Sequence, residues 1–136
     1  MKLEVITRVG AIVKDLEILE ITLPGKEMGQ FGILPGHKAL IAALDVGTMV
    51  ITTQQGEDWY TVSSGFVEVL GDLVRVLTQS CDKADEIDLD QAKADLEKAE
   101  AELGQVPVDE ADHYRVVIDQ IKLARARIAV ASRGKA

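Results

Sequence analysis

The sequence is poor in cysteine and proline, with one cysteine and three prolines in 136 residues. The single cysteine, Cys81, excludes an internal disulfide, which is typical of a reducing compartment. Its acidic neighbours Asp82 and Asp85 would raise the pKa of its thiol. We therefore expect a buried, inert cysteine and not a nucleophile.

Aromatic and basic residues are also scarce. Aromatic residues make up 4% of the chain and the net charge is −8, which argues against nucleic-acid binding because phosphate contacts need clustered Lys and Arg. Trp59, Tyr60 and Phe66 lie at strand spacing without basic neighbours, so we expect them in a core and not in a base-stacking platform. No apolar run approaches the roughly 18 residues of a membrane span. Residues 1–6 resemble a strand and not a signal or transit peptide, which predicts a complete chain that is not exported.

The residue patterns of catalysis and metal binding are missing. Gly29 and Gly32 stand next to no Lys-Ser/Thr pair, which excludes a phosphate-binding loop of the usual kind. His37 and His113 lie far apart in a chain with one cysteine, which predicts no metal site. His37 also has no neighbouring acid or nucleophile to work with. The sequence therefore predicts no catalytic residue, no metal and no cofactor.

The chain divides into two halves with different hydrophobic periods. Residues 1–84 alternate like strands, with Val67–Leu70 and Leu73–Leu77 joined by the hairpin turn Gly71-Asp72. Gln55-Gly56 predicts a second hairpin. Many short strands with close turns predict an antiparallel β-sandwich over residues 1–84.

Residues 85–136 have the 3-4-3-4 spacing of amphipathic helices. Asp88 is a predicted N-cap, with Gln91 in a capping-box position, and Gly104 is placed to end the first helix. Asp109 is the predicted N-cap of a second helix, so the segment is predicted to form an antiparallel two-helix hairpin and the fold class is α+β. The apolar stripes contain alanines, which predicts a weak contact: Leu89, Ala92, Leu96, Ala99 and Leu103 in one helix, and Val117, Ile121, Ala124 and Ile128 in the other.

Charge is separated along this hairpin. Residues 82–112 hold twelve acidic and three basic residues, a net charge of −9, whereas residues 113–136 hold six basic residues and one acidic residue, a net charge of +5. In one interpretation the two helices attract each other and otherwise present solvated faces, with pairs such as Lys98–Glu102 and Arg115–Asp119. In the other, the basic helix leaves its partner and binds another acidic surface, so that the hairpin is a switch.

The most specific stretch is residues 21–37, ITLPGKEMGQFGILPGH. Pro24-Gly25 suits the centre of a type II turn, and Gly29 and Gly32 would allow tight bends around Gln30-Phe31. Together with Leu44–Gly47, Ser64–Val69 and Asp88–Ala94, this ordered set of motifs closely resembles the epsilon-subunit family of rotary F-type ATP synthases. The resemblance covers essentially the whole chain and departs at Arg8–Gly10, where the family usually has a proline-containing turn.

This resemblance implies a non-catalytic subunit of the central stalk, or rotor. The sandwich would bind the gamma subunit and the polar loops of the c-ring, which couples ion flow to rotation. The contact residues implied by motif position are Gly29, Gln30, Phe31, Gly32 and His37. The hairpin would inhibit ATP hydrolysis when it extends into the catalytic head of alpha and beta subunits, with Arg115, Lys122, Arg125 and Arg127 meeting an acidic segment of the beta subunit.

Some members bind ATP through an Ile/Leu-Asp-X-X-Arg-Ala motif. Here Asp90, Lys93 and Arg127 are the corresponding candidates, but lysine replaces arginine and carboxylates follow on the next turns. These carboxylates would repel phosphate, and we predict weak or absent ATP binding. The family also implies a peripheral position on the cytoplasmic face of a bacterial inner or plasma membrane, with the stromal side of a plastid thylakoid membrane as the alternative. The alternatives in function are a free-standing nucleotide sensor and an adaptor that binds another acidic partner.

Overall fold

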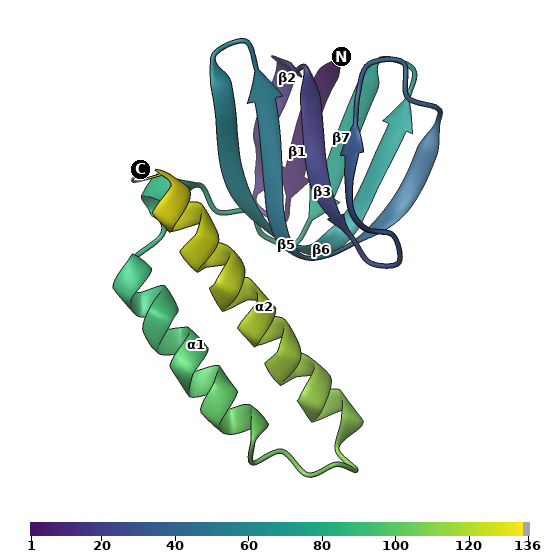
Figure 1. Ribbon diagram of the computed structural model, residues 1–136. Coiled ribbons are helices and arrows are strands. Elements are labelled where there is room, and N and C mark those ends of the chain that lie inside the picture. Colours follow the sequence, from purple (N-terminus) through teal and green to yellow (C-terminus); the bar gives the residue numbers. More distant parts are fainter. Residues whose placement is uncertain (135–136) are drawn as a thin grey trace.

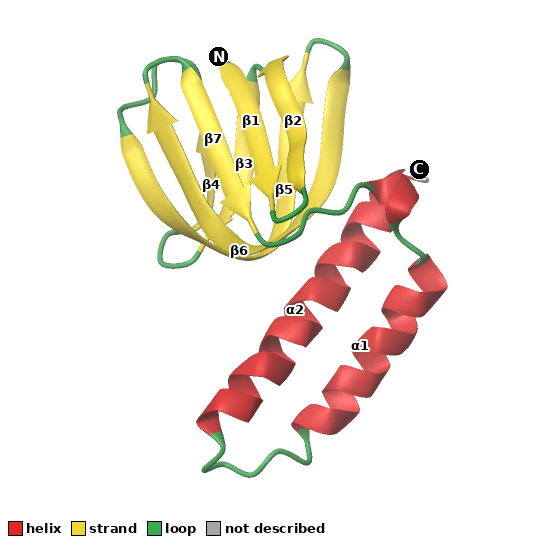
Figure 2. Ribbon diagram, turned by 180° about the vertical axis from the view of Figure 1, so that it is seen from behind, coloured by secondary structure: helices red, strands yellow, loops and turns green. Residues whose placement is uncertain are grey.

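The computed structural model describes residues 1–134, so the predicted hairpin segment 85–136 and the counted Lys135 reach just outside the described residues. Strands come first and helices last along the chain (Figures 1 and 2). The elements are β1 (Lys2–Thr7), β2 (Gly10–Glu17), β3 (Glu20–Gly25), β4 (Gly29–Ile33), β5 (Leu40–Thr53), β6 (Gly56–Leu70), β7 (Leu73–Thr78), the 3-10 helix η1 (Ala84–Glu86), α1 (Leu89–Leu103) and α2 (Ala111–Gly134).

The seven strands form one sheet in the order β2-β1-β7-β6-β5-β3-β4. All neighbouring strands are antiparallel except β1 and β7, which are parallel. The two longest strands, β5 and β6, pair along their whole lengths and bend together, so the sheet folds over into two layers (Figure 2). The predicted α+β fold with an N-terminal β-sandwich is thus confirmed, with one parallel pair inside it.

The bend in β6 falls at Ser64 and Gly65, which have φ angles of 76° and 139°. A Cβ atom on Gly65 would overlap the carbonyl oxygen of Leu77 on β7, so only glycine fits at this crossing. The β5–β6 register runs through this place without a shift, since Leu44 pairs with Gly65 and Val46 pairs with Ser63, and only Asp45 and Ser64 between them are unpaired. The bend is therefore built from the backbone conformation of Ser64 and Gly65 in β6 and not from a register shift between the two strands.

The sandwich core is made by the inward-facing residues of the strands, to which β2 contributes only the partly buried Val13 and Leu16. Tyr60 and Cys81 belong to this core, as predicted, and Trp59 is half-buried. Phe66 is a correction: it lies on the outer side of β6 with 57% of its surface exposed. The fully buried large side chains are Leu3, Val5, Ile18, Ile21, Leu23, Ile33, Leu44, Met49, Ile51, Val62, Val67 and Val74.

The type II turn is not at Pro24-Gly25, which end strand β3 and pair with β4. The pairing of β3 with β5 is interrupted between Thr22 and Gly25, so the missing N–H of Pro24 breaks no regular ladder. The turn is instead Leu34–His37: Gly36 has a φ of 85°, and the His37 amide donates to the Leu34 carbonyl at 3.1 Å. The turn between β5 and β6 is at Gln54-Gln55, one residue before the predicted Gln55-Gly56. The predicted turn between β6 and β7 is confirmed.

The first helix begins as predicted, because the Asp88 carboxylate accepts from the Gln91 amide at 3.1 Å. The capping box is only half made, since the Gln91 side chain donates to Asp95. Gly104 ends the helix as predicted, in a right-handed conformation with a φ of −66°. The second helix begins at Ala111, so Glu110 and not Asp109 precedes it.

Helix α2 lies between the sandwich and α1 (Figures 1 and 2). The predicted stripes face each other, and the contact between the helices is built on Ala99, Val117 and Ile121. Alanine buries far less area than leucine, which limits the free energy that this seam contributes. The side of α2 that faces β5 and β6 carries the remaining buried residues of the helix, among them Ala126, Val130 and Ala131.

Candidate functional site

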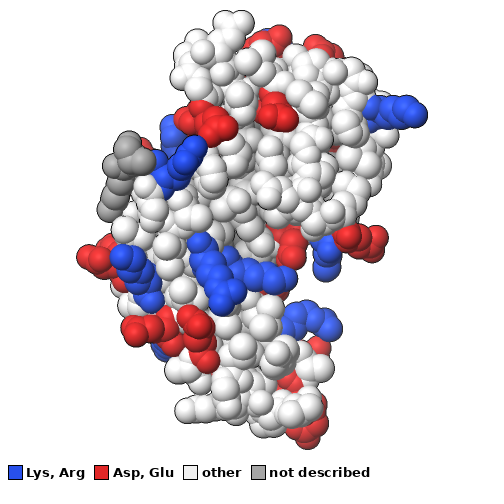
Figure 3. All heavy atoms as spheres, viewed as in Figure 1, with Lys and Arg blue, Asp and Glu red and all other residues white. Residues whose placement is uncertain are grey.

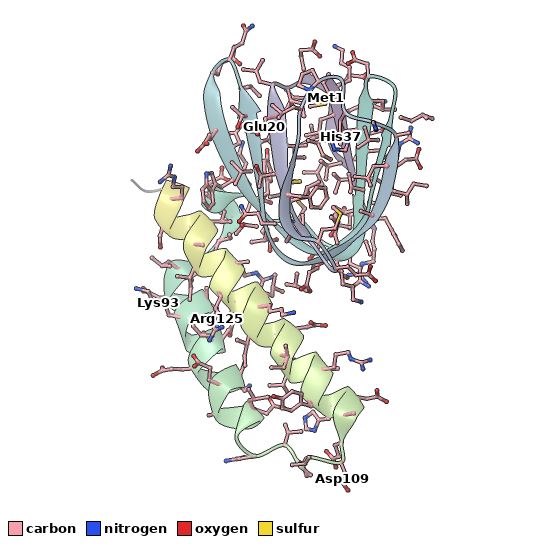
Figure 4. The ribbon with its side chains drawn as sticks, turned by 45° about the vertical axis from the view of Figure 1, so that its right-hand side comes forward. Met1, Glu20, His37, Lys93, Asp109 and Arg125 are labelled. Atoms are coloured by element: carbon pink, nitrogen blue, oxygen red, sulfur yellow. The ribbon has the colours of Figure 1, made fainter. Side chains whose placement is uncertain are left out.

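The predicted contact loop is in fact an edge strand followed by a turn. Gly29, Gln30 and Gly32 are exposed on β4, whereas Phe31 is half-buried and packs against the sandwich core. His37 lies beyond the other end of this strand, on the side of the sandwich opposite to the helices (Figure 4). Its ring Nδ1 is 2.8 Å from the carbonyl oxygen of Lys38. The structure therefore places Gln30 and His37 at opposite ends of one open edge.

A second exposed surface was not anticipated from the sequence. Ile41 on β5, Phe66 and Leu70 on β6, and Leu77 on β7 are 74%, 57%, 65% and 40% exposed. Phe66 pairs across the strands with Leu77, so these side chains share the outer face of one layer. We call these four residues the outer apolar face. The strand alternation contained the signal, because Phe66 and Leu70 are out of phase with the buried Val67 and Val69.

The outer apolar face continues into a groove of about 500 Å³ where the sheet bends. Phe66 and Leu77 contribute apolar lining, and Arg8 and Lys26 contribute positive charge. A large exposed apolar surface with polar edges is typical of a protein–protein contact. The groove suits a partner segment that combines apolar side chains with acidic ones.

Basic side chains of α2 tie the helix to the sandwich. The Lys122 ammonium lies 3.0 Å from Asp45 Oδ2 on β5, and Arg127 Nε lies 3.1 Å from Asp82 Oδ2. Burial alone would raise the pKa of Asp45, but its hydrogen bonds to Lys122 and to the Val46 amide, with the charge of Lys122, lower it overall. Two of the predicted inhibitory residues are therefore engaged with the sandwich in this arrangement.

A third contact lies at the C-terminal end of α2. Arg133 Nη2 is 3.6 Å from Glu57 Oε1, and the guanidinium carbon sits 5.3 Å from the centre of the Trp59 ring. This is a cation–π arrangement next to an ion pair. Sequence reasoning missed Arg133 because nothing in the spacing of the chain places it near Trp59.

Asp82 is the junction between the sandwich and the hairpin. Its backbone N–H, its carbonyl and its carboxylate all bond to Thr61, which is fully buried on β6. The same carboxylate oxygen that accepts from Thr61 also accepts from Arg127. The orientation of the linker is thus coupled to the position of α2.

The other two predicted inhibitory residues, Arg115 and Arg125, are exposed, and within residues 1–134 neither makes an ion pair. Figure 3 shows basic side chains gathered over the helical hairpin on one face of the molecule. In one of the two interpretations of the sequence, the helices attract each other through charge, with i,i+4 pairs along each helix. In the described chain, however, the bases of α2 pair with the sandwich, and the only side-chain ion pair between the helices is His113 with Glu102.

The nucleotide candidates are not brought together. Asp90 and Lys93 are exposed on α1, and Lys93 points away from the sandwich (Figure 4). Arg127 lines a small hollow of about 110 Å³ that neither of them lines. The acidic side chains around this hollow are those of Asp82, Glu86, Asp88 and Asp95. This environment opposes a phosphate group.

Three further properties of the described residues are the reactivity of the cysteine, the arrangement of possible metal ligands and the fitness of the helices to span a membrane. Burial, with Asp82 and Glu86 adding negative charge, raises the pKa of the Cys81 thiol to about 12. The expected burial of this cysteine is confirmed. Within residues 1–134, no three His, Cys, Asp or Glu side chains are arranged to hold a metal ion, and neither helix has the length and apolar character needed to cross a bilayer.

Residues 1–84 match the family model described as ATP synthase, Delta/Epsilon chain, beta-sandwich domain. The chain is 40% identical over 137 residues to ATP synthase epsilon chain 2 of Syntrophotalea carbinolica, an alignment that covers 98% of this chain and 95% of that protein. It is 37% identical to the ATP synthase epsilon chain of Citrifermentans bemidjiense, covering 100% and 95%.

Two solved structures share the fold. A chain of the Euglena gracilis mitochondrial ATP synthase, a structure of OSCP, F1 and c-ring, superposes with a TM-score of 0.80 at 23% identity, covering 93% of this chain and 79% of that one. A chain of the Tetrahymena thermophila mitochondrial ATP synthase central stalk and c-ring superposes with a TM-score of 0.60 at 14% identity, covering 100% and 96%.

Proposed function

The chain belongs to the ATP synthase delta/epsilon family, and from this premise we propose that it is a non-catalytic central-stalk subunit of an F-type ATP synthase. It would couple ion translocation to ATP synthesis, and its hairpin would inhibit ATP hydrolysis. The observation that carries the proposal is the similarity along both halves of the chain to proteins named ATP synthase epsilon chain. The proposed position is peripheral, on the cytoplasmic face of a bacterial inner or plasma membrane, with the plastid thylakoid membrane as the alternative.

The sandwich offers two surfaces to the proposed partners. The open edge that carries Gln30 supports contact with c-ring loops, because an exposed polar edge can pair with polar loop backbone. The outer apolar face, with Phe66 and Leu77 over the groove, supports contact with the gamma subunit, because desolvating these side chains would stabilise a protein interface. His37 lies past the end of the edge, on the side of the sandwich opposite to the helices (Figure 4).

The charges of α2 support an inhibitory role. When α2 is docked on the sandwich, some of its basic side chains pair with sandwich acids and others remain exposed. Lys122 and Arg127 are bound to Asp45 and Asp82, so they would have to leave the sandwich before they meet an acidic segment of the beta subunit. The sandwich and the beta subunit would thus compete for the same two bases. Each contact is partly exposed and of modest free energy, which allows both arrangements to be populated.

Co-purification tests the assignment. The chain, tagged at its N-terminus and expressed in its source cell, should recover gamma, alpha, beta and ring subunits in fixed ratio from mild detergent. Recovery of the chain alone, or with unrelated partners, would contradict the proposal and favour a free-standing sensor or an adaptor.

Truncation and charge removal test the inhibitory role. Deleting residues from Ile87 onward should raise ATP hydrolysis by the assembled complex while assembly persists. Replacing Arg115 and Arg125 together with glutamine should raise hydrolysis as well, since both are exposed and outside the docking contacts. Lys98→Gln removes one positive charge from α1 and serves as a control for the loss of positive charge elsewhere on the hairpin. Hydrolysis unchanged by the truncation would leave the hairpin without an inhibitory role.

Nucleotide binding by the isolated chain is the remaining question. The acidic surroundings of Arg127, and its separation from Lys93, support weak or absent binding of ATP. Isothermal titration calorimetry should show a dissociation constant in the millimolar range or no binding. Tight micromolar binding would contradict this and favour the nucleotide-sensor alternative.

A further inference from the structure

We propose that His113 is a proton-dependent clasp that closes the free end of the helical hairpin. The free end is the connector between α1 and α2, residues 104–110, which lies far from the sandwich (Figure 4, where Asp109 is labelled). The clasp follows from the geometry of the hairpin and does not depend on whether the hairpin inhibits hydrolysis.

Both ring nitrogens of His113 face carboxylates. Nε2 lies 3.2 Å from Glu102 Oε1 in the last turn of α1, and Nδ1 lies 3.1 Å from Glu110 Oε2 just before α2. An ionised carboxylate can only accept hydrogen bonds, and a neutral imidazole has only one N–H to donate. Both contacts can therefore be hydrogen bonds only when the ring carries two protons.

The clasp joins different elements of the hairpin. Glu102 belongs to α1 and Glu110 to the connector, so the imidazolium holds the connector and both helix ends together. Within the described chain, Glu110 and Glu102 are the charged groups that act on the ring from these elements, and neither carboxylate has a Lys or Arg at ion-pair distance. When the ring is neutral, one contact is lost and no basic side chain replaces it.

Only a small apolar contact supports this end of the hairpin otherwise. The seam consists of Ala99, Val117 and Ile121, flanked by Leu103 and Val106. Val108, at the tip of the connector, is fully exposed and contributes no buried area. A proton-dependent contact can therefore change how often the helix ends separate.

The direction of the pH dependence follows from the shift of the His113 pKa. Hydrogen bonds to Glu110 and then to Glu102 raise this pKa above the ordinary value of 6.5, against a smaller effect of desolvation. The contribution of the clasp to hairpin closure is complete at pH values below the pKa of His113 in the unfolded chain. It is lost as the pH rises through the higher folded value.

The first test is the titration of the histidine ring protons by NMR in the full chain. The chain has two histidines, and His37→Gln assigns the resonances. Glu102→Gln and Glu110→Gln should each lower the pKa of His113, because each removes a charged acceptor. Glu97→Gln, on an exposed position of α1, is the matched control and should leave it unchanged. A His113 pKa that is the same in all four proteins would overturn the clasp.

The second test measures opening of the hairpin end by amide hydrogen exchange, corrected for the intrinsic rate at each pH and referred to the amides of the β6–β7 hairpin. In the natural chain, protection of the amides around the connector should fall about two- to fivefold from pH 6 to pH 8, the range of an exposed ion pair. His113→Gln should show the lower protection at both pH values, and His37→Gln should behave like the natural chain. Equal protection of the natural chain and His113→Gln at pH 6 would show that the His113 ring does not hold the end of the hairpin closed.

Discussion

Replacing Arg127 with glutamine is expected to loosen α2 from the sandwich, whereas the same replacement at Arg125 is not. Arg127 Nε donates to Asp82 Oδ2 at 3.1 Å, and the two side chains are 34% and 28% exposed. Arg125 is an exposed base on the same helix that has no ion-pair partner in residues 1–134, which makes it a matched control.

The expected magnitude lies between two limits. A hydrogen bond to a charged group contributes about 1.5–3 kcal/mol when buried, and an exposed ion pair contributes about 0.2–1 kcal/mol. With roughly a third of each side chain in water, we expect the Arg127–Asp82 pair to contribute about 1 kcal/mol, or about fivefold in the equilibrium between docked and undocked α2. Among residues 1–134, removing Arg127 also leaves the Asp82 carboxylate with only the Thr61 hydroxyl as side-chain donor.

A double-mutant cycle of Arg127→Gln and Asp82→Asn isolates the pair from the other effects of each replacement. The measured quantity is the free energy of local opening of α2, obtained from native-state hydrogen exchange. Trp59 gives an independent optical reading, because it is the single tryptophan and lies under Arg133 of α2. Acrylamide should quench its fluorescence more strongly in Arg127→Gln.

Two results would refute this reasoning. A coupling energy below about 0.2 kcal/mol would mean that the pair contributes no more than the weakest exposed pairs. An equal loss of protection in Arg125→Gln would mean that the charge of the helix matters and the contact with Asp82 does not.

Three further predictions concern the sandwich. Gly65→Ala should lower the free energy of unfolding by about 3 kcal/mol or more in urea titrations, because its Cβ would overlap the Leu77 carbonyl at a positive φ, and a loss below about 1 kcal/mol would contradict this. Cys81 should resist iodoacetamide at pH 8 in the folded chain and react in urea, since burial raises its pKa to about 12; rapid labelling of the folded chain would argue against it. Lys122→Gln should raise the pKa of Asp45, measured by carboxyl NMR. In the natural chain the lowered pKa of Asp45 stabilises the fold at pH values above 3.8, the ordinary pKa of an aspartate. This contribution is lost as the pH falls through the pKa of Asp45 in the folded chain. An unchanged Asp45 pKa in Lys122→Gln would exclude the ion pair as the cause of the shift.

Local signals predicted the elements well where one physical cause dominated. Asp88 begins α1 because its carboxylate caps a free amide, and no tertiary contact is needed for that. The turn at Gly71-Asp72 likewise joins two strands by local geometry. The proline-glycine turn was assigned to the wrong pair, because Pro24-Gly25 and Pro35-Gly36 are equivalent locally. Only the pairing of β3 with β4 and the bulge against β5 decide which pair turns.

The interaction surfaces show the same division. The charge separation of the hairpin was plain in the sequence, but the sequence left open whether the basic helix pairs with α1 or with another acidic surface. Asp45, Asp82 and Glu57 receive the bases, and their closeness to α2 depends on how the sheet folds over and where the linker leaves it. Phe66 was expected inside, although its phase along β6 places it outside.

The sequence by itself determined the two halves of the chain, the period of each, the alanine-rich seam and the family, because these depend on residue type and on spacing along one element. The tertiary structure alone decided which acids hold Lys122 and Arg127, and that His113 closes the end of the hairpin. These outcomes depend on distances between segments up to 77 positions apart in the chain. Such distances are set by the packing of whole elements, which local residue patterns do not contain.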